Sequence, residues 1–264
     1  MPNRGTPFAC WWDDPLVVAI APKLGDSRLT AWRRNIAVVL VGVAIGCGSW
    51  SPAACLVVGA IAVTIAPTTG LRVTVGLAAV ASPWLPWPAP ALLAVAGWYA
   101  VWLLQKSPRP NRTSHRVRVS QVIVSCSVGL AAGAIAALIA SNRLIGEPIV
   151  LQLQKPALEF IVAAVIGLSA LNAVAEELLW RVALFSETDT RLAIPVASQA
   201  ISFGAAHWAG IPYGWSGVIL AGVFSVALVM IKSRWGLSAT LLAHFGADLV
   251  IFSAVGWTVI FAPG

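Results

Sequence analysis

Residues 157–180 read ALEFIVAAVIGLSALNAVAEELLW, an apolar run that contains three acids. A helix needs roughly 20 such residues to cross the hydrocarbon core of a bilayer, so this run predicts a transmembrane helix. Two of the acids, Glu176 and Glu177, lie inside the span. Ionisable side chains at such depth are costly, pair with one another and mark a functional site by default. This helix is therefore the first candidate to carry chemistry.

The whole chain has the composition of a membrane protein. Of its 264 residues, 59% are hydrophobic and 10% are charged, and the mean hydropathy is +0.85. A soluble domain carries about 25% charged residues, so these values predict an all-α, polytopic transmembrane bundle with about eight spans. Residues 36–66 are predicted to form two thin helices or one broken helix. The candidate segments are 36–50, 53–66, 73–85, 89–104, 119–140, 157–180, 192–208, 215–231 and 237–260.

The net charge of +7 is explained by membrane topology, because the cations lie between the apolar runs and no soluble domain displays them to a nucleic acid. The positive-inside rule places the N-terminus and the connector 106–118 in the cytoplasm. Binding of anionic lipid headgroups is the alternative for the connector. The basic groups are Lys23, Arg28, Arg33 and Arg34; Lys106, Arg109, Arg112, Arg116 and Arg118; and Lys232 with Arg234.

The connector divides the chain into two regions. Residues 1–118 hold apolar spans with almost no charge inside them, which predicts a transmembrane scaffold followed by the basic connector. In this half, Trp84, Trp87 and the segment 98–102 indicate interfacial anchors or packing residues. Residues 119–264 hold every chemically suggestive side chain and are predicted to form the catalytic core. The four cysteines are scattered without a Cys-x-x-Cys pair, which indicates neither a disulfide framework nor a cysteine zinc site.

The first polar cluster contains Glu176, Glu177 and Arg181. In a helix, Glu177 and Arg181 share one face at i and i+4, so Glu177 is expected to neutralise Arg181. Glu176 points about 100° away, on the stripe of Asn172 and Trp180, and is the freer carboxylate. A desolvated carboxylate suits a general base near neutral pH. The alternative is that these three charged side chains form a network with a purely structural role.

Two further clusters repeat the i, i+4 spacing. Phe203 and His207 share a helix face, so the phenyl ring can shield the imidazole, and His207 can share a water with Glu176. A hydrogen-bonded core histidine is the alternative for His207. On the last helix, His244 and Asp248 suggest a carboxylate that orients an imidazole.

Together the clusters offer a base, a second proton-handling group and polar groups for an oxyanion, which amide hydrolysis requires. They also offer a zinc site, in which Glu176, His207 and His244 would leave one position open for water. Neither histidine belongs to a His-Glu-x-x-His motif. The residues alone therefore leave a glutamate-dependent and a metal-dependent mechanism open.

The order of these motifs resembles the CAAX protease and bacteriocin-processing family, whose intramembrane proteases include the type II CAAX prenyl endopeptidase. That pattern is Glu-Glu-x-x-x-Arg, then Phe-x-x-x-His, then His-x-x-x-Asn or Asp, on separate helices. The chain carries it in order from residue 119 to its end, as Glu176, Glu177 and Arg181, then Phe203 and His207, then His244 and Asp248.

The resemblance implies a helical bundle around a water-filled cavity open to the cytoplasmic side. It implies that Glu176 and His207 activate water, and that His244 and Asp248 line the oxyanion pocket, although the family has also been regarded as metal-dependent. Prenyl endopeptidases favour Asn at the last position, and an ionised Asp cannot donate to an oxyanion. Asp248 is therefore expected to be protonated, to orient His244 or to assist a metal.

The expected function is endopeptidase action on a small peptide or a membrane-embedded segment, because bacterial members of the family also serve bacteriocin maturation or self-immunity. The compact chain fits a bacterial member. The alternative is a non-enzymatic binding, immunity or transporter-accessory protein that uses the same polar cluster for recognition. The sequence does not indicate an oligomeric state.

Overall fold

The computed structural model describes residues 28–105, 118–144, 157–185 and 193–261. Within these ranges the regular elements are all helical, which confirms the predicted all-α fold. The predictions for the N-terminal residues 1–27 and for most of the basic connector fall outside the described residues.

The helices follow the apolar segments of the sequence. They are α2 (Arg28–Gly48), α3 (Pro52–Ile65), α4 (Thr69–Ala81), α5 (Ala89–Leu104), α6 (Val119–Leu144), α7 (Leu158–Glu177), the π-helical turn η2 (Leu178–Ala183), α8 (Ala193–Ala206), the 3₁₀ turn η4 (His207–Ala209), α9 (Trp215–Trp235) and α10 (Leu237–Phe261). The segment 36–66 forms two helices, α2 and α3, which separate at residues 49–51.

Helix length divides the described helices into two groups. Five are long and apolar enough to cross a membrane, namely Leu29–Gly48, Val119–Ala140, Leu158–Ala183, Trp215–Trp235 and Leu237–Thr258. Helices α3, α4 and α5 are apolar but have only 14, 13 and 16 residues. Helix α8 has 14 residues. The protein is therefore a multi-pass helical bundle, and the number of complete spans stays a prediction.

Local sequence signals set several helix boundaries. The Ser51 side chain accepts a hydrogen bond from the Ala54 amide and so caps α3, and Thr68 caps α4 in the same way. Gly236 separates α9 from α10 at φ +84°, in the left-handed region that glycine adopts without strain. This tight turn keeps α9 beside α10.

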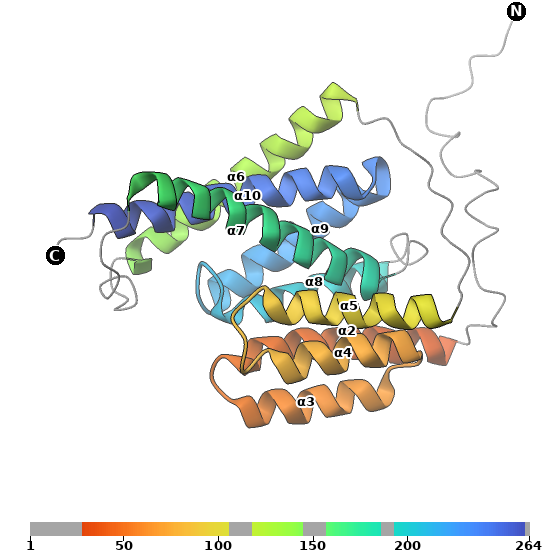
Figure 1. The fold of residues 1–264 in the computed structure, drawn as a ribbon. Coiled ribbons are helices and arrows are strands. Elements are labelled where there is room, and N and C mark those ends of the chain that lie inside the picture. The colour runs from red at the N-terminus through yellow and green to blue at the C-terminus, as the bar shows by residue number, and fades with distance from the viewer. Residues whose placement is uncertain (1–27, 106–117, 145–156, 186–192, 262–264) are drawn as a thin grey trace, which may run out of the picture.

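The bundle is built in two stacks joined through α8 and α9 (Figure 1). Helices α2 to α5 lie together in the lower part of the view, and α6, α7 and α10 lie together above them. Helix α8 packs on both α2 and α9, and α10 packs on α6, α7 and α9. The Ser202 hydroxyl of α8 donates to the carbonyl of Val38 in α2. The N-terminal helices thus contact the segment that carries the second motif.

Helices α6 and α10 make close contact through small residues. A Cβ atom placed on Gly129 or Gly133 of α6 would overlap the backbone of Ala243 or Ala247 of α10. Gly129 and Gly133 form a Gly-x-x-x-Gly pattern, which lets membrane helices approach backbone to backbone. The contact holds α10 against α6 at Ala243, the residue directly before His244.

Replacing Gly129 with valine is expected to destabilise the protein by about 1–3 kcal/mol, because the added side chain must push α6 away from α10. Thermal unfolding in detergent micelles measures the effect. The matched control is Gly167→Val on α7, where an added Cβ would meet nothing within 4 Å. Equal melting temperatures for the two variants would contradict the proposed close contact.

Candidate active site

The first motif lies where α7 changes into a π-helical turn. Helix α7 ends at Glu177, and Leu178–Ala183 continue as η2, closed by the bond from the Leu184 amide to the Leu179 carbonyl. Single π turns inside helices occur frequently at functional sites. Here the turn begins directly after the two glutamates and contains Arg181.

Glu177 and Arg181 form a buried pair. The Arg181 Nε atom lies 3.5 Å from Glu177 Oε2, and both side chains are fully buried. Arg181 also donates from Nη2 to the Ser225 hydroxyl of α9 at 3.3 Å, and its guanidinium lies 4.8 Å from the centroid of the Phe203 ring. Arg181 therefore connects the end of α7 with α8, which carries the second motif, and with α9.

His244 is held by Glu177. Its Nδ1 atom lies 2.8 Å from Glu177 Oε1, whereas its Nε2 atom lies 3.8 Å from Asp248 Oδ2, beyond hydrogen-bond distance. The nearer carboxylate to this imidazole is thus Glu177 on α7, whereas Asp248, which was expected to orient the ring, lies within ion-pair distance of Nε2. The i, i+4 spacing does put both side chains on one face of α10, but Nδ1 points to the other helix.

Asp248 is held from α7 as well. The Asn172 side chain donates from Nδ2 to Asp248 Oδ2 at 3.0 Å, and both residues are buried. An amide donor one turn before Glu176 therefore fixes the carboxyl group of Asp248 beside the site.

His207 lies at the end of α8, where the α-helix passes into the 3₁₀ turn η4. Its Nδ1 atom lies 2.7 Å from the carbonyl oxygen of Phe203. A carbonyl only accepts, so Nδ1 carries a proton, and Nε2 has a lone pair whenever the ring holds no second proton. The Phe203 ring packs against the imidazole with a centroid distance of 4.3 Å. His207 is also the more exposed of the two motif histidines, with 24% of its side chain accessible.

Glu176 is the point at which the three clusters meet. Its Oε1 atom accepts a hydrogen bond from the indole Nε1 of Trp87 at 2.7 Å. Its Oε2 atom lies 3.4 Å from His244 Nε2 and 3.7 Å from His207 Nε2, and has no hydrogen-bond partner among the described residues. One carboxylate oxygen is thus held, while the other faces two imidazoles.

The charges of these groups require shared protons. The site holds three carboxylates and one guanidinium, and the Lys232 ammonium donates to the backbone carbonyl of Arg181. Burying uncompensated charge is costly, so the carboxylates and imidazoles of the site are expected to share protons. Such a site can accept and return protons within a few ångströms.

The donor types also suit zinc, which takes imidazole nitrogen and carboxylate oxygen. Across residues 28–105, 118–144, 157–185 and 193–261, however, no three or more His, Cys, Asp or Glu side chains are arranged to hold a metal ion. The set predicted for zinc, Glu176, His207 and His244, fits zinc in its donor chemistry, and zinc binding stays a prediction.

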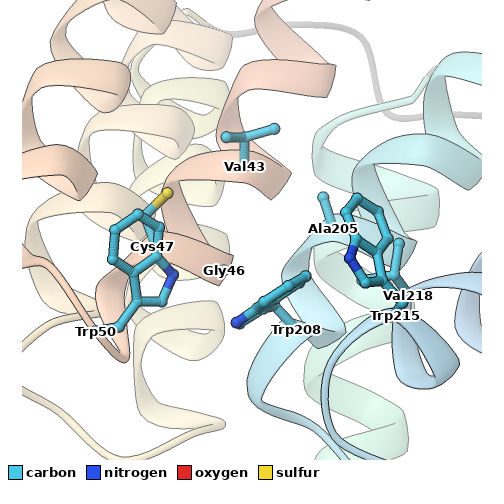
Figure 2. Close-up of a pocket in the computed structure, with 8 residues that line it drawn as sticks. All are labelled: Val43, Gly46, Cys47, Trp50, Ala205, Trp208, Trp215 and Val218. Carbon is cyan, nitrogen blue, oxygen red and sulfur yellow. The ribbon is translucent and has the colours of Figure 1, made fainter.

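A separate apolar pocket lies between α2 and the ends of α8 and α9 (Figure 2). It has a volume of about 190 Å³ and includes three tryptophans, Trp50, Trp208 and Trp215, in its lining. None of the residues of the three motifs lines it. Its lining residues include no acid or imidazole, so this pocket is distinct from the polar site.

Two features of the site were missed from the sequence. Trp87 was interpreted as an interfacial anchor or packing residue, yet it bonds to Glu176 from 89 positions away. No local pattern around Trp87 marks this contact, since its loop also holds Trp84 and several prolines. The π-helical turn was missed too, because the residues Leu178–Ala183 look like ordinary helix formers.

Residues 158–250 match the model of a family described as type II CAAX prenyl endopeptidase Rce1-like. The matched segment runs from the start of α7 into α10 and contains all three motifs. No curated protein and no solved structure matches the chain. The match confirms the resemblance stated from the motifs.

Proposed function

We propose that this chain, whose residues 158–250 carry an Rce1-like domain from a family of intramembrane proteases, is an intramembrane endopeptidase with Glu176 as its general base. The substrate would be a peptide or a membrane-protein segment. The observation that carries the proposal is the free oxygen of Glu176, which faces the imidazoles of both His207 and His244.

The reacting water would sit between Glu176 Oε2 and His207 Nε2. These atoms are 3.7 Å apart, too far for a direct hydrogen bond and close enough for one bridging water. Both atoms can accept a proton from that water, because Oε2 is a carboxylate oxygen and Nε2 of neutral His207 keeps its lone pair. The water oxygen then attacks the carbonyl carbon of the scissile bond as its proton passes to Glu176.

His244 is placed to stabilise the oxyanion that forms in this step. Its Nδ1 is held by Glu177, so a protonated ring would direct its Nε2–H toward the space beside Glu176. Glu176 then returns the proton to the leaving nitrogen, the C–N bond breaks, and a carboxylic acid and an amine are released. Asp248, held by Asn172, supplies a second polar group next to His244.

The test of the proposed function is product formation. Membranes from cells that express the normal protein or the Glu176→Gln variant are compared by peptide profiling. We expect peptides that appear only with the normal protein. If both membranes give the same peptides while a candidate peptide still binds, the polar cluster serves recognition, as in a binding or immunity protein.

Removal of divalent metal ions is expected to leave the cleavage rate unchanged, because the proposed mechanism activates the water with Glu176 and His207 and assigns no step to a metal. The measurement is cleavage by the purified protein after dialysis against a chelator, with elemental analysis of the same sample. Loss of activity that returns with added zinc would contradict this expectation and favour the zinc mechanism.

A further inference from the structure

Trp87 reaches the proposed catalytic carboxylate from the N-terminal half of the chain. It lies in the loop between α4 and α5, is half-buried, and packs against the main hydrophobic core. Its indole Nε1 donates to Glu176 Oε1 at 2.7 Å. This is a short bond between a neutral donor and an acid at the centre of the site.

The contact assigns different tasks to the two oxygens of Glu176. The terminal torsion of a glutamate side chain is broad, so packing alone holds the carboxylate plane poorly. Indole nitrogen is a donor only, so it binds one oxygen and cannot exchange roles with it. With Oε1 held in this way, Oε2 is directed toward His207 and His244.

The loop itself is stiff on both sides of the indole. Pro86 and Pro88 flank Trp87, and each proline ring fixes its own φ angle. The carbonyls of these prolines accept hydrogen bonds from the amides of Ala89 and Leu92, which join the loop to the first turn of α5. The backbone that carries the donor is therefore held by hydrogen bonds within the N-terminal half.

We infer that Trp87 is a positioning residue, which fixes Oε1 of Glu176 so that Oε2 faces the reacting water. This inference rests on the proposed endopeptidase function. It makes the N-terminal helices part of the hydrolytic machinery, in addition to their packing role. The competing explanation is that the indole only fills space beside α7.

The two explanations are separated by removing the N–H group and keeping the shape. Replacing Trp87 with 3-benzothienylalanine puts sulfur in place of the N–H group at nearly constant size, and Trp87→Phe removes the donor with loss of one ring. The substrate is a peptide that spans a cleavage site found in the peptide profiles. We expect both variants to lose about 10–100-fold in kcat, as for other orienting partners, with KM unchanged.

The matched control is Trp84→Phe, because Trp84 lies three residues earlier in the same loop and is 68% exposed. This variant should cleave at the normal rate. Normal kcat for the benzothienyl variant would overturn the positioning role and leave the proposed function standing. A raised KM with normal kcat would also overturn it, since that result indicates substrate binding.

An indole spectrum tests the contact without using activity. In protein labelled with ¹⁵N-tryptophan, the Trp87 N–H resonance is identified by its absence from Trp87→Phe. We expect Glu176→Ala to move this resonance and to leave that of Trp84 in place. An unmoved Trp87 resonance would overturn the inference. A normal protein that cleaves nothing would overturn the proposed function, and the spectrum would still report on the contact.

Discussion

Replacement of Glu176 by glutamine is expected to abolish peptide hydrolysis while the protein stays folded in the membrane. Glutamine keeps the size of the side chain, and its carbonyl oxygen can still accept the hydrogen bond from Trp87. It cannot take a proton from water, so the variant loses the general base. A positioned general base contributes about 10²–10⁴-fold to the rate, and the loss should reach that range.

Cleavage rate and thermal unfolding are measured on the same purified sample. Glu159→Gln is the matched control, because Glu159 undergoes the same chemical change in the exposed first turn of the same helix. Its position, 17 residues before Glu176, is about 25 Å away along the axis. Normal cleavage by Glu176→Gln would remove the carboxylate from the mechanism. A large fall in its melting temperature would instead indicate a structural role.

Replacement of Glu177 by glutamine is expected to destabilise the fold by about 3–5 kcal/mol, because it leaves the buried charge of Arg181 without its counter-ion. The same change removes the carboxylate that holds Nδ1 of His244. Both losses fall in a region where the side chains are fully buried. Thermal or denaturant unfolding in micelles measures the effect.

A double variant separates the charge effect from simple loss of packing. Arg181→Met keeps much of the side-chain volume and removes the charge, so Glu177→Gln combined with Arg181→Met should be more stable than Glu177→Gln alone. The difference between the double variant and the sum of the single variants gives the coupling energy of the pair. An unchanged melting temperature for Glu177→Gln would contradict the role of the pair in holding α7.

The parts of the site that could be predicted are those fixed by helical spacing. Residues four apart share a face in an α-helix, so the pair of Glu177 with Arg181 and the packing of Phe203 on His207 follow from the chain itself. The apolar composition then predicts that such charged side chains pair with one another inside the bundle. Fold class and candidate residues could be obtained in this way.

The contacts between helices could not be predicted in the same way. The spacing of His244 and Asp248 is compatible with a direct contact, but the nearer partner of His244 is Glu177, 67 residues earlier. Trp87 gave no signal, since tryptophans near helix ends already have an explanation as interfacial anchors. The packing of α5 against α7 and η2 brings the indole of Trp87, in the loop before α5, to Glu176.

The short helices on the N-terminal side of the bundle would impose a hydrophobic mismatch on the surrounding lipid if they cross it as predicted. Helices α3, α4 and α5 are about 20–24 Å long at 1.5 Å per residue, and their outer faces expose apolar side chains such as Leu56, Val80 and Leu93. A bilayer core of about 30 Å adapts to such helices by local thinning. In that arrangement headgroups and their hydration would lie deeper on this side of the protein, which would shorten the path of solvent toward the buried acids and suit thin membranes better than sterol-rich ones.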